Sequence, residues 1–204
     1  MIDPDEGIPR PAAEDLLSGH VLIDVGAGVV APSSDLLPDL DGVGHPKVGA
    51  GAGLRLGVGV ARSVSLDLLG GFAWLGGGDL CEDCRSYAFD AGLGVTYHVV
   101  QGIAFDPWIG YAAGYRHLLL TLPDSTERYH ALDFARLGVG ADFYPAPTVG
   151  LGPFIETDIG VRTGADASVY ALFSAGVRVA FDPMRAGLSL APGGTGGTGA
   201  TAAR

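Results

Sequence analysis

The sequence predicts an all-β protein, specifically an eight-stranded antiparallel up-and-down transmembrane β-barrel. First, apolar residues alternate with glycine and other small or polar residues along most of the chain, which is the period of a β-strand. Second, long and short connections separate the alternating segments in turn. Third, no uninterrupted apolar run approaches the roughly 20 residues of a transmembrane helix, although the mean hydropathy is +0.32 and only 17% of residues are charged.

The first four expected strands each carry one apolar face. Their ranges and apolar residues are 20–30 (Val21, Ile23, Val25, Ala27, Val29), 48–60 (Val48, Ala50, Ala52, Leu54, Leu56, Val58, Val60), 64–75 (Leu66, Leu68, Phe72, Trp74) and 87–99 (Phe89, Ala91, Leu93, Val95, Tyr97, Val99). The second is the clearest, because its other face is glycine with the single charge of Arg55. A face this small fits a narrow lumen. Leu69 interrupts the alternation of the third.

The last four expected strands follow the same rule. They are 103–117 (Ile109, Tyr111, Ala113, Tyr115), 131–144 (Ala135, Leu137, Val139, Ala141, Phe143), 151–162 (Ile155, Thr157, Ile159, Val161) and 169–181 (Ala175, Val177, Val179, Phe181). Pro107 is tolerable near a strand start. Most of the eight segments are about 10 to 13 residues long, which is near the roughly 9–11 residues of a tilted transmembrane strand.

The connections alternate in length. Segments 31–47, 76–86 and 118–130 are expected to be long loops, 61–63, 100–102 and 145–150 to be short, and 163–168 to be of modest length. The barrel then has a long-loop end and a short-turn end, as outer-membrane barrels do. We expect an irregular N-terminal segment over 1–18, a barrel domain over 19–182 and a flexible tail rich in Gly, Thr and Ala over 183–204.

The composition and the N-terminal segment limit the possible partners and cellular location of the protein. A net charge of −11 argues against a nucleic-acid partner, which requires a basic surface. The N-terminal segment is acidic and has no apolar h-region, so no signal peptide is expected in the chain as it stands. The sequence is then a mature or mis-started form of an exported protein, or the barrel is soluble.

Charged side chains gather on the small-residue face of the strands. They are Asp24, Arg55, Asp67, Asp90, His98, Arg116, Arg136, Asp142, Glu156, Asp158, Arg162 and Arg178. Isolated charges inside a narrow barrel are costly, so we expect them to pair and to form a filled polar core. An ion or proton path, or a gate, is the alternative reading of the same set.

Aromatic residues on the apolar face fall near the two ends of the strands. Those near the long-loop end are Phe72, Trp74, Phe89 and Tyr115, and those near the short-turn end are Tyr97, Phe105, Phe143 and Phe181. Two aromatic belts at the membrane interfaces are expected. The general preference of aromatic residues for strands is the alternative explanation.

The last strand carries a motif. Ser174, Gly176, Val179 and Phe181 match the pattern polar, any, Gly, any, any, apolar, any, aromatic. This resembles the terminal-strand signal of bacterial outer-membrane barrels, and the chain from about His20 to Phe181 resembles the small barrels of the outer-membrane protein A and W kind. The resemblance implies residence in the lipid of a Gram-negative cell outer membrane and recognition by the barrel-assembly machinery. Unlike that signal, this one is not terminal, and the tail is too short for a peptidoglycan-binding domain.

Two cysteines, Cys81 and Cys84, lie in an expected long loop. A disulfide suits an oxidising compartment. Free thiols remain open, as does a metal site assisted by His45, His117 and His130, although zinc needs about four ligands. A thioredoxin-like role would need a βαβ context that is missing.

A catalytic set is not indicated. Some barrels of this size modify lipids with His, Ser and an acid near the outer rim, and His117, His130, Ser125 and Asp133 could take those places, but no spacing requires it. We expect a monomeric, non-enzymatic barrel without cofactor or metal and with a structural, adhesive or small-solute role. The alternatives are a narrow channel or transporter and a soluble ligand-binding barrel.

Overall fold

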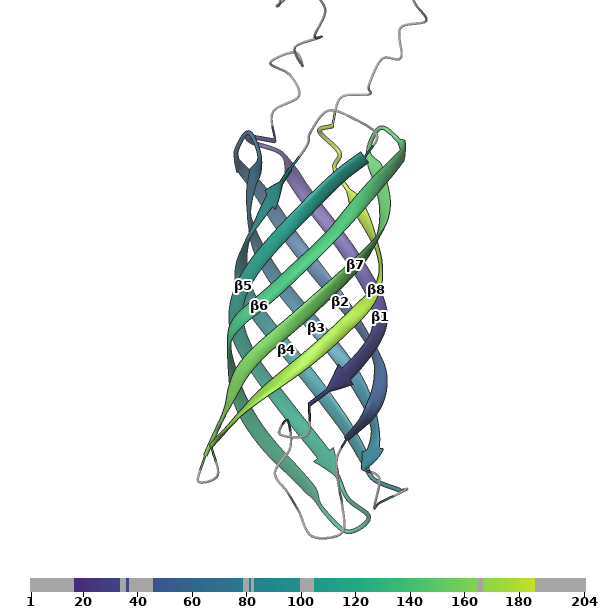
Figure 1. The fold of residues 1–204 in the computed structure, drawn as a ribbon, viewed down its shortest axis with the longest axis vertical. Coiled ribbons are helices and arrows are strands. Elements are labelled where there is room, and N and C mark those ends of the chain that lie inside the picture. The colour runs from purple at the N-terminus through teal and green to yellow at the C-terminus, as the bar shows by residue number, and fades with distance from the viewer. Residues whose placement is uncertain are drawn as a thin grey trace, which may run out of the picture.

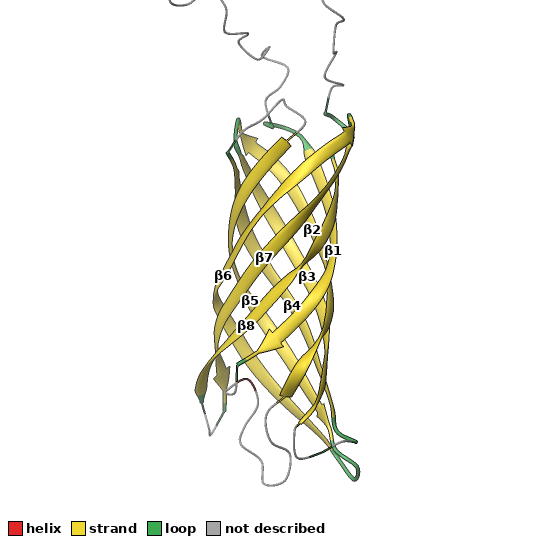
Figure 2. Cartoon of the chain, turned by 45° about the vertical axis from the view of Figure 1, so that its right-hand side comes forward, coloured by secondary structure: helices red, strands yellow, loops and turns green. Residues whose placement is uncertain are grey.

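The computed structural model is a closed barrel of eight antiparallel strands in sequence order, with β1 pairing with β8 to complete the wall (Figures 1 and 2). It describes residues 17–33, 36, 46–78, 81, 83–99, 105–164 and 167–185. The strands are β1 (Val21–Pro32), β2 (Pro46–Ala61), β3 (Val64–Gly78), β4 (Arg85–His98), β5 (Phe105–Thr121), β6 (Thr126–Ala146), β7 (Val149–Thr163) and β8 (Ser168–Phe181). The expected fold class is confirmed.

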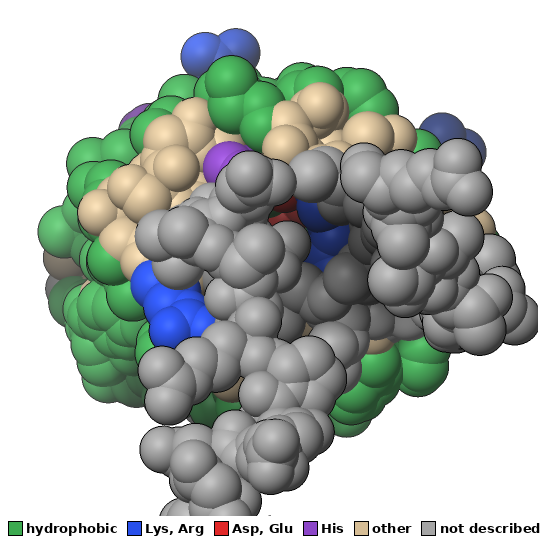
Figure 3. Space-filling model, turned by 90° about the horizontal axis from the view of Figure 1, so that it is seen from above, with side chains coloured by type: hydrophobic (Ala, Val, Ile, Leu, Met, Phe, Trp, Pro, Cys, Tyr) green, Lys and Arg blue, Asp and Glu red, His purple; other side chains and the backbone are tan. Residues whose placement is uncertain are grey.

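Alternation along each strand separates two environments. Outward side chains are apolar and exposed, as for Val25 (54%), Leu93 (69%) and Ile155 (61%). Viewed from the short-turn end, hydrophobic side chains form most of the periphery of the molecule, and charged side chains are visible inside it as well as at a few places on the rim (Figure 3). The exposed apolar band on the outside is what a barrel in contact with lipid requires. The described residues include no helix long and apolar enough to cross a membrane.

The connection between β5 and β6 differs from the expectation. A long loop over 118–130 is wrong, because β5 continues to Thr121 and β6 begins at Thr126. Leu118 and Leu120 point inward and are buried, so the alternation of β5 persists past the expected end. The Leu122 amide donates to the Ser125 carbonyl at 2.8 Å and closes a tight turn. The two strands thus extend as a hairpin whose backbone N–H and C=O groups hydrogen-bond to each other.

A β-bulge interrupts the alternation of β6. Asp133 faces Gly160 and Ala135 faces Ile159, so Phe134 is an extra residue. Tyr111 on the outer face donates a hydrogen bond to the Phe134 carbonyl at 2.8 Å. Because the bulge shifts the side-chain period by one residue, Asp133 points into the lumen rather than to the outside.

The two ends of the barrel hold different connections. Short turns join β2 to β3 and β6 to β7, beside the start of β1 and the end of β8 (top of Figure 1). Segments 34–35, 37–45, 79–80, 82, 100–104 and 165–166 lie outside the described residues, as do 1–16 and 186–204, which hold most of the expected N-terminal segment and tail.

Candidate functional site

The lumen holds the charged residues that the sequence indicated, with Arg116 at the centre. Its Nη2 lies 2.8 Å and its Nε 3.1 Å from Asp133 Oδ2, and Nη2 also contacts Asp158. Tyr170 donates its hydroxyl hydrogen to Asp133. Arg116 and Asp133 are each 1% exposed. A guanidinium with two carboxylate partners offsets the large cost of burying each charge alone.

Arg136 extends this cluster across β4, β6 and β7. Its nitrogens lie 2.7 Å from Asp90 Oδ1, 3.0 Å from Asp158 Oδ1, 3.3 Å from Asp133 Oδ2 and 3.7 Å from Glu156 Oε1. The guanidinium has five N–H donors in a planar fork, which allows one side chain to serve several acids. These contacts tie three strands together through the interior.

A second cluster lies nearer the short-turn end, around Arg178. Arg178 donates from Nε to Asp142 Oδ1 at 3.0 Å and from Nη1 to Asp24 Oδ2 at 3.1 Å. Its guanidinium lies 3.8 Å from the ring centre of Trp108, which is 2% exposed. Arg55 approaches the same ring at 5.1 Å. Trp108 therefore fills the lumen as a cation–π partner of both arginines.

Asp67 is connected to Arg55 through the hydroxyl group of Thr96. It accepts hydrogen bonds from Ser65 at 2.8 Å and from Thr96 at 2.5 Å, and Thr96 in turn accepts one from Arg55 at 3.1 Å. Arg55 also lies 3.9 Å from Glu156. The hydroxyls thus join Asp67 to the central charges.

Two further members of the expected network lie towards the two ends of the barrel. His98 pairs with Asp106 at 2.9 Å near the short-turn end. Arg162 is buried towards the long-loop end, with its guanidinium 5.9 Å from the ring centre of Tyr129. The network is thus layered along the barrel axis.

Towards the long-loop end the lumen holds a cluster of buried apolar side chains. Leu36, Leu75 and Leu120 are fully buried there. The whole cluster comprises Val30, Leu36, Ala73, Leu75, Ala88, Leu118, Leu120, Ala131, Tyr170 and Leu172. This plug separates the charged clusters from the long-loop face, and it was not expected from the sequence.

A cavity of about 120 Å³ remains between the charged clusters and the glycine-rich wall of β1 to β3. Arg55, Asp90, Arg136 and Glu156 are among its polar lining residues. A buried water needs roughly 10–15 Å³ of such volume, so the space suits a small cluster of waters.

Residues that follow the last strand contact the short-turn end of the barrel. Asp182 contacts His20 at 2.7 Å, and its amide donates to the Thr148 carbonyl at 2.9 Å. Arg185 lies 3.5 Å from the ring centre of Tyr144 and 3.8 Å from Asp106. The chain thus turns back over the barrel mouth directly after Phe181.

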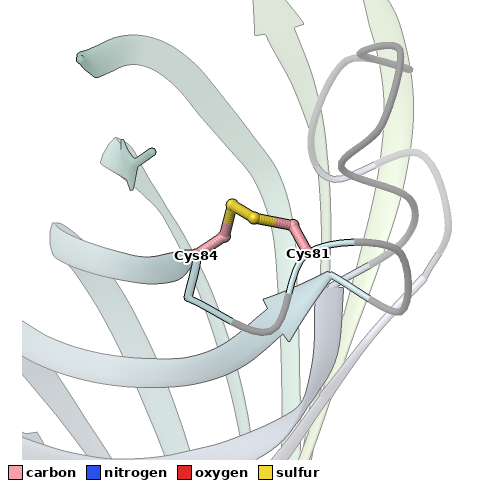
Figure 4. The surroundings of a disulfide bond; sticks show 2 residues. All are labelled: Cys81 and Cys84. Carbon is pink, nitrogen blue, oxygen red and sulfur yellow. A yellow bond between two sulfur atoms is a disulfide. The ribbon is translucent and has the colours of Figure 1, made fainter. Parts of the chain in front are cut away.

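The aromatic residues of the two expected belts point outward. All eight aromatic residues of the two expected belts are at least 40% exposed. In the expected assembly signal, Val179 and Phe181 point outward, and Ser174 and Gly176 face the lumen side of β8. Cys81 and Cys84 are joined by a disulfide just before β4 (Figure 4).

The possible hydrolase set is not assembled. Asp133 points into the lumen, whereas His117 and His130 lie on the outer face of the wall. Ser125 is in the tight turn beyond them. No group of three or more His, Cys, Asp or Glu side chains is placed to hold a metal among the described residues, and His45 lies outside them.

Several lumen residues were missed. Asp133 was hidden by the bulge, although an acid between Leu132 and Phe134 is itself a sign of an inward position. Asp106, Thr96 and Tyr170 carry no distinctive pattern, and their roles depend on which strands lie opposite.

Comparison with protein-family models and with curated proteins found no match. Solved structures do match. Neisserial surface protein A has a TM-score of 0.58 at 12% identity, covering 79% of this chain and 96% of that chain. The outer membrane protein OprG from Pseudomonas aeruginosa has a TM-score of 0.53 at 14% identity, covering 82% and 98%. The chain has the fold of small eight-stranded outer-membrane β-barrels, as the resemblance implied.

Proposed function

We propose that this protein is an integral, non-enzymatic β-barrel of a Gram-negative outer membrane that acts as a closed scaffold for the segments at its long-loop end. The observation that carries the proposal is the filled lumen, in which an apolar plug lies on the long-loop side of paired buried charges. An eight-stranded barrel is just wide enough for its side chains to fill. A structural or adhesive role then lies with the long-loop face.

The outer surface supports a membrane setting. Apolar side chains are exposed on all eight strands, far beyond the patches that soluble monomers expose. Two of the structural neighbours are named as a surface protein and an outer membrane protein. Outer-membrane lipid, the barrel-assembly machinery reading Ser174 to Phe181, and a monomeric state are part of this proposal.

A narrow channel is the second candidate, and the cavity beside Arg136 and Glu156 is the observation that favours it. Conductance in planar bilayers separates the two. A closed scaffold gives no steady single-channel current. Leu120→Ala, which removes part of the apolar plug, should also give none, because the charged clusters still block the lumen. Steady current through the wild-type chain that changes in Arg136→Ala and Glu156→Ala would support the channel and overturn the scaffold.

Membrane insertion is tested separately by migration on gels. A folded outer-membrane barrel in detergent migrates differently before and after heating. If the purified chain stays monomeric and folded without detergent, the membrane proposal fails and a soluble barrel is favoured.

A further inference from the structure

The permanently charged side chains on the outer face of the described strands are all bases, and all lie at the long-loop end. They are Lys47 on β2, Arg85 on β4 and Arg128 on β6, and each is exposed. No Asp or Glu side chain points outward from the described strands, although the chain carries a net charge of −11. The outer face at this end therefore has the opposite sign to the protein as a whole.

Strand pairing brings Lys47 and Arg85 to the two sides of an open position. Lys47 pairs with Gly76 on β3, and the pairing of Leu75 with Ser86 places Gly76 beside Arg85. The Cα atoms of the two bases are thus two strand spacings apart, about 10 Å. Because Gly76 has no side chain, both cationic groups can reach one ligand between them.

Arg85 and Arg128 lie in the same way on the two sides of β5. Arg85 pairs with Thr121, which pairs in turn with Thr126 on β6. Arg128 follows two residues after Thr126 on the same face and pairs with Leu119. Guanidinium and hydroxyl donors therefore lie side by side across three neighbouring strands.

The acidic residues described at this end do not neutralise the three bases. Asp83 and Asp124 lie in turns beyond the ends of the strands. Glu127 pairs with the fully buried Leu120 and so belongs to the lumen side of β6. Among the described residues, the three bases form no ion pair with any acid. Their charges are thus available to an anionic partner from outside the chain.

Aromatic residues place the bases at the level of lipid headgroups. Trp74 pairs with Tyr87 one outward row nearer the barrel centre than Gly76 and Arg85. Trp and Tyr gather at the headgroup level of membranes, so the next row outward meets the phosphates. Arginine presents a planar fork of donors that matches the oxygens of a phosphate.

We propose that Lys47, Arg85 and Arg128 bind the phosphate headgroup of anionic lipids in the leaflet at the long-loop end. The inference rests on the proposed membrane setting and adds the lipid chemistry that the wall selects. The outward row at the other end, Tyr97, Phe105, Phe143 and Phe181, carries no charge. The selection therefore applies to one leaflet.

The test is calorimetric titration of short-chain phosphatidic acid into the full chain folded in micelles of an uncharged detergent. We expect the wild type to bind phosphatidic acid and not to bind short-chain phosphatidylcholine. Arg85→Gln and Arg128→Gln should each weaken binding by about fivefold, and the triple variant with Lys47→Gln should abolish it. Arg62→Gln removes an exposed base from the turn between β2 and β3 at the opposite end, and this matched control should bind like wild type.

Heat-modifiable migration shows that each variant is folded before titration. A folded wild type that binds phosphatidic acid no better than phosphatidylcholine overturns this inference and leaves the membrane proposal standing. An equal loss in Arg62→Gln also overturns it, because net charge alone would then explain the binding. Equally tight binding of inorganic phosphate would overturn the choice of a lipid partner. A chain that is monomeric and folded without detergent removes the membrane setting, and this inference with it.

Discussion

Arg116 on β5 and Asp133 on β6 form an ion pair at the centre of the lumen in which two guanidinium nitrogens contact one carboxylate oxygen, at 2.8 and 3.1 Å. Both residues are almost fully buried. Asp158 from β7 contacts the same guanidinium, so one arginine joins three consecutive strands. The wall and its filling are therefore stabilised together.

Replacing Arg116 with Met should destabilise the barrel strongly. Removing one member of a buried ion pair leaves the remaining charges uncompensated and typically costs about 3–5 kcal/mol. Urea unfolding in lipid vesicles, followed by tryptophan fluorescence, measures the change. Arg128→Ala, at an exposed position of the hairpin, is the control and should stay within about 0.5 kcal/mol of wild type. Similar losses in both variants would contradict the role given to the buried pair.

Strand number, strand faces and most inward charges could be predicted because alternation is a local property. In β2, glycine alternates with apolar residues along the strand. This pattern identifies the lumen face and the outer face without knowledge of the neighbouring strands. Arg178 and Asp24 were expected inside for the same reason. Which charges meet depends on the stagger of the strands around the barrel, and that is not encoded in any one strand.

Local irregularities in the strands explain why some features of the lumen and of β6 were not predicted from the sequence. The bulge at Phe134 reverses the faces of β6, so Asp133 was assigned no place in the network. The polar residues from Thr126 to His130 suggested a loop, yet they pair with the end of β5. The apolar plug was missed because Leu36 comes from outside the strands and Leu120 from beyond the expected end of one.

The seam between β1 and β8 depends on a glycine pair. Gly28 faces Gly176 across the ladder, and a Cβ added at Gly28 would lie 2.7 Å from the Gly176 Cα. Gly28→Ala should therefore lower stability by about 1–3 kcal/mol through overpacking. Gly53→Ala is the matched control, because its nearest neighbour would be the Gly70 oxygen at an ordinary 3.6 Å. Equal unfolding midpoints in urea for the two variants would show that the seam has room to adjust.

Reduction of the disulfide should leave the barrel folded. Cys81 and Cys84 close a loop of four residues, for which the loop-entropy model gives about 2 kcal/mol. A reducing agent should shift the unfolding midpoint of the wild type slightly and should not shift that of the Cys81→Ser, Cys84→Ser double variant. Loss of heat-modifiable migration on reduction alone would mean that the bond supports far more of the fold than its own loop.

Asp182 links the two ends of the described barrel chain. Its carboxylate contacts His20 at 2.7 Å and accepts from the Met184 amide at 3.0 Å. Asp182→Ala removes both contacts and leaves donors in a nearly buried setting without their acceptor, which typically costs about 1–3 kcal/mol. Urea unfolding measures the loss, and hydrogen exchange should rise first in the amides that pair β1 with β8. Met184→Ala changes a side chain that is 56% exposed and should have no effect on either measurement. If Asp182→Ala behaves like Met184→Ala, the residues after Phe181 rest on the barrel mouth without stabilising its closure.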